Sequence, residues 1–109
     1  TRVQTCALPI SYVMKLDVVQ YVSTMNTPND PVLLVQEVLD RHYCFDVSQT
    51  LKDYLKDILL SGQSSNYYWT NAWDDYANNP TNATYYMIVE SRLSSMFQYL
   101  MKLAEYQLA

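Results

Sequence analysis

Apolar side chains recur along most of this chain with the spacing of α-helices, and the last segment shows the pattern most clearly. Thr81 or Asn82 can cap a helix that extends to about Gln107, in which apolar residues return every three or four positions. This spacing predicts one long helix with a continuous buried face. If the face is buried, Leu100→Ala should cost about 2–5 kcal/mol of stability, and a loss below about 0.5 kcal/mol would contradict the packing. The predicted face consists of Val89, Leu93, Met96, Phe97, Leu100 and Leu103, widened by Met87, Tyr99, Met101 and Tyr106.

The first half of the chain predicts two helices. Residues 12–24 place Leu16, Val19 and Val22 on one helical face, although their β-branched content leaves a short strand as the alternative. Asp30 and Pro31 then have the order of an N-cap followed by proline at the first helical position. The second helix should end near residue 43, with an ion pair between Glu37 and Arg41. Its expected face consists of Val32, Val35, Val38, Leu39 and His42, flanked by Leu34.

A third helix begins after Asp46 or Ser48 and should end at Gly62, where a left-handed cap costs a glycine least. Its expected buried stripe consists of Leu51, Tyr54, Leu55, Ile58 and Leu59. Residues 63–68 follow as a polar loop. Residues 69–76 then predict a short helix, which stops before Pro80.

Four to five helices joined by short loops predict an all-α fold with antiparallel or orthogonal, bundle-like packing. The composition agrees, because the chain has a single glycine and an all-β fold of this length needs many turn residues. One glycine also cannot build a phosphate-binding loop, and the sequence predicts no cofactor.

Charge excludes two classes of partner. With 7 Lys and Arg against 11 Asp and Glu, the net charge of −4 lacks the basic surface that nucleic acids or anionic lipids require. No apolar run is long enough to predict a membrane span.

Candidate catalytic or metal-binding residues are few. His42 and Cys44 are too close along one helix end to face each other, so we expect a packed histidine and a small buried thiol. Asp74 and Asp75 diverge on a helix and should serve as surface charges. Asn82 begins a glycosylation-like triplet but suits a helix cap better. We therefore predict no catalytic residue and no metal ligand in this chain, and leave open whether the whole protein is an enzyme.

An aromatic group is the one feature that suggests a ligand or a partner. Aromatic rings beside the amides of Gln63, Asn66 and Asn71 can stack a sugar ring or contact a protein loop. Alternatively, the rings pack beneath the last helix as part of the core. Exposure of Trp69 and Trp73 distinguishes the two, since buried rings cannot bind a sugar. The group consists of Tyr67, Tyr68, Trp69, Trp73 and Tyr76.

The first ten residues, TRVQTCALPI, differ from the rest of the chain and closely resemble the translation of a common sequencing-library adapter. We interpret residues 1–10 as non-native and leave them out of the fold prediction. On this interpretation, residues 11–109 are the helical C-terminal subdomain of a larger, truncated protein.

A series of short motifs supports a similar conclusion. LLSGQ (59–63), YYWT (67–70), Ala72-Trp73, a V-x-x-RL pattern (89–93) and LAEYQL (103–108) together resemble the C-terminal end of the bacterial domain of unknown function 1800 family, in its Bacteroidota-type members. The resemblance covers roughly residues 15–109. It implies a mostly helical and often exported protein, several times longer than this chain, with no assigned activity and no catalytic residue to transfer.

Three functions follow as expectations. The first is a structural helical subdomain that packs against the rest of its parent polypeptide. The second is a glycan-binding or protein-binding surface built on the aromatic group. The third is a non-catalytic part of an enzyme whose active site lies upstream.

Overall fold

The computed structural model describes residues 17–42 and 47–108, with side-chain surroundings as far as residue 102. Five helices and no strand occur within these residues, which confirms the all-α prediction. The helices are α2 (Val18–Ser23), α3 (Pro31–His42), α4 (Gln49–Leu59), α5 (Tyr67–Asn78) and α6 (Ala83–Leu108). The adapter-like segment 1–10, both cysteines and the predicted helical residues 12–16 lie outside the described part.

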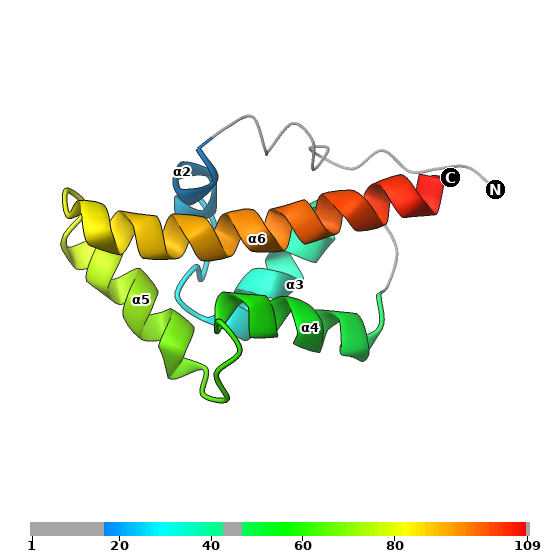
Figure 1. Ribbon diagram of the computed structural model, residues 1–109, viewed down its shortest axis with the longest axis horizontal. Coiled ribbons are helices and arrows are strands. Elements are labelled where there is room, and N and C mark those ends of the chain that lie inside the picture. The colour runs from blue at the N-terminus through cyan, green and yellow to red at the C-terminus, as the bar shows by residue number, and fades with distance from the viewer. Residues whose placement is uncertain (1–16, 43–46, 109) are drawn as a thin grey trace.

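Helix α6, with 26 residues, is the longest of the described helices and the one around which the others are arranged. It runs along the length of the molecule, with α2 on one side and α4 and α5 on the other (Figure 1). It packs against all three of these helices, while α3 packs against α4. The core-facing prediction for α6 is confirmed for Val89, Leu93, Met96, Phe97 and Leu100, which are all fully buried. The side chains of residues 103 and 106 lie outside the described part.

Helix starts follow the predicted capping residues. The Asp30 carboxylate accepts hydrogen bonds from the backbone N–H groups of Val32 and Leu33, at 3.0 and 3.2 Å. Ser48 caps α4 through the N–H of Leu51, at 3.2 Å. Asn82 caps α6 through the N–H of Tyr85, at 3.1 Å. Local chemistry therefore fixes where these three helices begin, and the helix-start interpretation of Asn82 is confirmed.

Other local predictions need correction. Val32 is 48% exposed, and the buried face of α3 runs instead through Pro31, Leu34, Val35, Val38, Leu39 and His42. Tyr54, predicted in the buried stripe of α4, is 49% exposed, although its ring packs against Tyr99 with 4.7 Å between ring centroids. Met87 is 65% exposed. In each case the residue lies at the border of the predicted buried face. Whether such a border residue is buried depends on how far the neighbouring helix extends over it.

The short helix is also longer than predicted. It begins at Tyr67 and ends at Asn78, so residues 67 and 68, predicted to lie in the loop 63–68, belong to α5. The predicted ion pair of α3 is present, with 2.8 Å between Arg41 and Glu37. α3 ends at His42, close to the predicted boundary.

The end of α4 uses two left-handed residues where one was predicted. Gly62 has the expected positive φ of 81°, but Ser61 before it also has a positive φ, of 56°. The N–H of Ser61 bonds to the carbonyl of Ile58, and that of Gly62 to the carbonyl of Asp57, which closes the helix in a Schellman motif. A serine side chain is strained in this region, because its Cβ approaches the following carbonyl.

Ser61→Gly is therefore expected to stabilise the protein by about 0.5–1 kcal/mol, since the relief of left-handed strain exceeds the added freedom of the unfolded chain. Urea denaturation followed by circular dichroism measures the difference. Gly62→Ala is the matched comparison and should destabilise, because φ is positive there as well. Equal or lower stability of Ser61→Gly would show that position 61 is not strained.

Candidate functional site

The predicted aromatic group is divided by α5 into a buried and an exposed half. Trp69 is fully buried and Trp73 is 5% exposed, and Tyr76 is partly buried beside them. Tyr67 and Tyr68 are 69% and 50% exposed. Residues 69, 73 and 76 share one helical face and turn toward α6, whereas 67 and 68 lie on other faces.

The buried rings form a continuous series from α5 to α6. Ring centroids lie 5.9 Å apart between Trp69 and Trp73, 5.4 Å between Trp73 and Tyr76, and 6.0 Å between Tyr76 and Tyr86. These distances and the tilted ring planes are typical of packed aromatic side chains in a core. The rings therefore hold α5 against α6.

Hydrogen bonds from α5 fix the distant loop before α3. The indole Nε1 of Trp69 donates to the carbonyl of Pro28 at 2.7 Å, and the Thr70 hydroxyl donates to the carbonyl of Asn29, also at 2.7 Å. Both contacts join residues 41 positions apart. The polar edge of Trp69 is thus occupied by the chain itself.

The burial of both tryptophans argues against a sugar-binding site built on their rings. A sugar ring stacks on an aromatic face that water can reach, and neither tryptophan presents such a face on this chain. The exposed aromatic rings that remain from the predicted group are Tyr67 and Tyr68, at the start of α5.

His42 is packed, as its position in the sequence predicts. It is 8% exposed, and its Nε2 lies 3.0 Å from the Tyr21 hydroxyl. Its ring meets Phe97 edge-on, with 6.4 Å between centroids. Arg41 lies over the Tyr21 ring, and its pKa is raised, chiefly through the Tyr21 hydroxyl. The histidine thus helps join α3 to α2 and α6.

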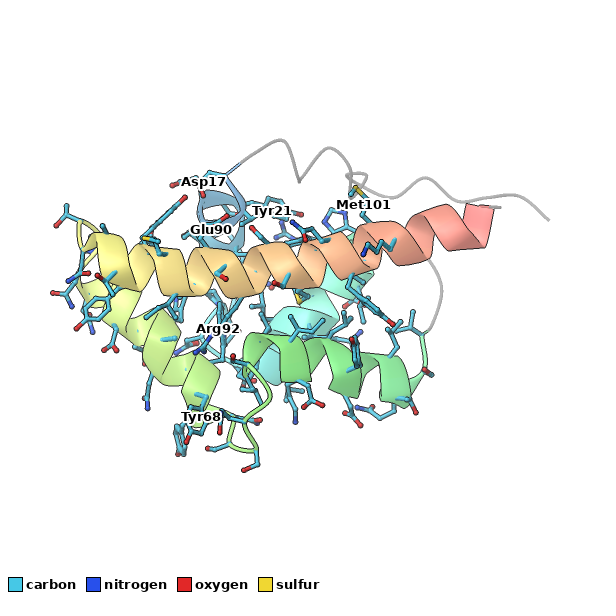
Figure 2. The ribbon with its side chains drawn as sticks, in the orientation of Figure 1. Asp17, Tyr21, Tyr68, Glu90, Arg92 and Met101 are labelled. Atoms are coloured by element: carbon cyan, nitrogen blue, oxygen red, sulfur yellow. The ribbon has the colours of Figure 1, made fainter. Side chains whose placement is uncertain are left out.

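A second polar contact joins α6 to the start of α2. The Tyr86 hydroxyl on α6 donates a hydrogen bond to the Asp17 carboxylate at 2.9 Å. The same carboxylate oxygen caps α2, because it accepts a hydrogen bond from the N–H of Val19 (Asp17 in Figure 2). Burial and then the bond to Asp17 raise the pKa of Tyr86 to about 12. Sequence analysis did not identify this pair, which is 69 positions apart.

A groove on the outer face of α6 is a further feature that sequence analysis missed. It has a volume of about 480 Å³ and lies where α6 passes the end of α4. Arg92 is on its wall, between α6, α5 and the end of α4 (Figure 2). In the sequence, Arg92 stood out only as one letter of the V-x-x-RL pattern. The groove is lined by Ser61, Thr84, Met87, Ile88, Ser91 and Arg92.

The Arg92 guanidinium is held by backbone carbonyls. One terminal nitrogen donates to the carbonyl of Tyr68 at 2.9 Å and to that of Leu59 at 3.3 Å. Burial lowers the pKa of Arg92, because the charged form loses solvation. The side chain therefore joins the ends of α4 and α5 to α6 and carries a partly desolvated charge at the groove.

Acidic residues do not gather into a metal site in the described part of the chain. Over residues 17–42 and 47–108, no three His, Cys, Asp or Glu side chains lie close enough together to hold a metal ion. Asp75 is exposed and Asp74 partly so, as expected of surface charges. Among the same residues, no helix combines the length and apolarity needed to cross a membrane.

Comparison of the chain with known protein families, with curated proteins and with solved structures finds no match in any of the three.

Proposed function

We propose that this chain is a structural helical unit, the C-terminal subdomain of a larger protein, which packs against the rest of its parent polypeptide. The burial of Trp69 and Trp73 is the observation that supports this most directly. These rings belong to the one group that suggested a ligand, and they are used to hold α5 to α6. Trp69 also fixes the loop at Pro28.

The outer face of α3 supplies the surface for such packing. Val32 and Leu33 are 48% and 51% exposed and stand side by side in the first turn. Beside Val32, a shallow groove of about 150 Å³ runs between α3 and α4, walled by the polar side chains of Gln49, Lys52 and Lys56. Adjacent exposed aliphatic residues beside a polar rim are typical of a surface that another segment covers.

Hydroxyl-radical footprinting tests the proposal on two samples: this chain alone and the longer polypeptide, obtained by recovering the complete reading frame. We expect Val32 and Leu33 to be oxidised readily in the chain alone and protected several-fold in the longer protein. Leu34, which is fully buried, serves as the internal reference in both. Equal oxidation of Leu33 in the two samples would reject packing through α3.

A protein-binding or glycan-binding surface is the second candidate, supported by the exposure of Tyr67 and Tyr68. Tyrosine is enriched at interfaces because it offers a large ring with a polar tip. A glycan array probed with the chain, and with a Tyr67→Ser, Tyr68→Ser double variant, tests the sugar-binding form. Specific signals that vanish in the double variant would favour this candidate over the structural one.

A further inference from the structure

The groove on α6 combines an apolar wall with several polar side chains. Met87 and Ile88 are 65% and 38% exposed and form the apolar part. Thr84, Ile88 and Ser91 follow one another along one side of α6 at spacings of four and three residues, and Arg92, which comes directly after Ser91, lines the same groove. A volume of about 480 Å³ falls in the range of sites for small organic ligands.

Arg92 carries a positive charge that no carboxylate neutralises within the described residues. The contrast with Arg41 is direct, since Arg41 lies 2.8 Å from Glu37. One terminal nitrogen of Arg92 bonds to two carbonyls, which fixes the guanidinium while its remaining N–H groups stay available. A partly desolvated charge without a counter-ion costs free energy, which a bound anion recovers.

Three hydroxyl side chains line the same groove as the guanidinium. Over the residues that the structure describes, the side chains of Ser61, Thr84 and Ser91 make no hydrogen bond within the protein. Other hydroxyls on the same helices do bond internally, as Ser94 does to Glu90 at 2.7 Å. The groove therefore contains hydroxyl donors, a guanidinium and an apolar wall.

We propose that this groove binds a small amphipathic monocarboxylate, with its carboxylate on Arg92 and its apolar chain on Met87 and Ile88. A guanidinium recognises a carboxylate through charge-assisted, often paired, hydrogen bonds. Hydroxyls that line the same groove can donate further hydrogen bonds to the carboxylate. A single cation suits a singly charged head group, and the net charge of −4 disfavours a polyanion. The site is separate from the α3 surface of the structural proposal and does not depend on it.

Octanoate is the probe, and the methyl group of Met87 is the reporter. In a chain labelled with ¹³C-methyl methionine, the Met87 resonance is assigned with Met87→Leu. We expect it to shift and saturate with a Kd of about 1 mM as octanoate is raised to about 10 mM. The resonances of Met25 and Met96, which are buried in the core, should stay in place.

Matched ligands and variants isolate the role of the charge. Octan-1-ol has the same chain without the carboxylate and should bind at least about tenfold more weakly. Arg92→Gln should weaken octanoate binding by a similar factor. Arg92→Lys should weaken it by less, since lysine keeps the positive charge but cannot donate the paired hydrogen bonds of a guanidinium. Arg92 also joins α4 and α5, so unchanged Met25 and Met96 resonances are required of each variant.

Three results would overturn the proposal. One is the absence of a saturable Met87 shift with octanoate in the unsubstituted chain. Another is equal binding of octanoate and octan-1-ol, a comparison that needs no variant to fold. The third is tighter binding, by about tenfold, of the capped peptide acetyl-Leu-Glu-Leu-amide, which would assign the groove to a polypeptide partner. None of these results alters the α3 footprint, so the two proposals fail separately.

Discussion

Trp69→Ala is expected to lower the free energy of unfolding by about 3–5 kcal/mol, the largest effect of any single substitution predicted for this chain. The indole is fully buried and packs against the ring of Trp73. Its removal leaves a cavity and also removes the hydrogen bond to Pro28, which holds the loop before α3. Since small domains have total stabilities of about 5–15 kcal/mol, the variant should be near the limit of folding.

Urea denaturation monitored by circular dichroism measures the loss of stability in Trp69→Ala. Tyr67→Ala is the control on the same helix and should change stability by less than about 0.5 kcal/mol, because its ring is 69% exposed. Trp69→Phe separates the two contributions, since it keeps a ring but leaves the Pro28 carbonyl without its donor. A loss below about 1 kcal/mol for Trp69→Ala would contradict a core position for the indole.

Leu100→Ala should cost about 2–5 kcal/mol, as predicted from the spacing of apolar residues alone. The structure supplies the reason, because Leu100 is fully buried with Met96 and Phe97 on the inner face of α6. The same measurement applies, with Gln98→Ala as the control. Gln98 is exposed on the same helix, so its replacement should be nearly neutral. A loss below about 0.5 kcal/mol for Leu100→Ala would mean that this turn of α6 is not packed.

Local signals in the sequence identified the helices well, and they failed at the edges. Asp30, Ser48 and Asn82 cap helices as predicted, because capping depends on residues only two or three positions away. Val32 and Met87 have apolar side chains at suitable spacing, yet both are exposed. Periodicity gives the direction of the buried face, whereas the extent of burial depends on how much of the face a neighbour covers.

The candidate site was less predictable than the fold. The aromatic group was recognised from sequence, but its division into buried Trp69 and exposed Tyr67 required the position of α6. The groove was not foreseen, because Ser61 follows α4 while Arg92 lies 31 positions later on α6 (92 − 61 = 31). Ser61 belongs to LLSGQ and Arg92 to the V-x-x-RL pattern, and neither short pattern indicates that the two residues meet.

Sequence alone determined the all-α class, the main buried faces of the helices and the residues that begin α3, α4 and α6, since capping and helical spacing depend on contacts within about one helical turn. Tertiary structure decided which polar groups meet. The bonds from Trp69 to Pro28 and from Tyr86 to Asp17 join residues 41 and 69 positions apart. Such pairs carry no periodic signal, because they depend on where whole helices cross. The same crossing of α6 over the end of α4 places the charge of Arg92 beside an apolar wall.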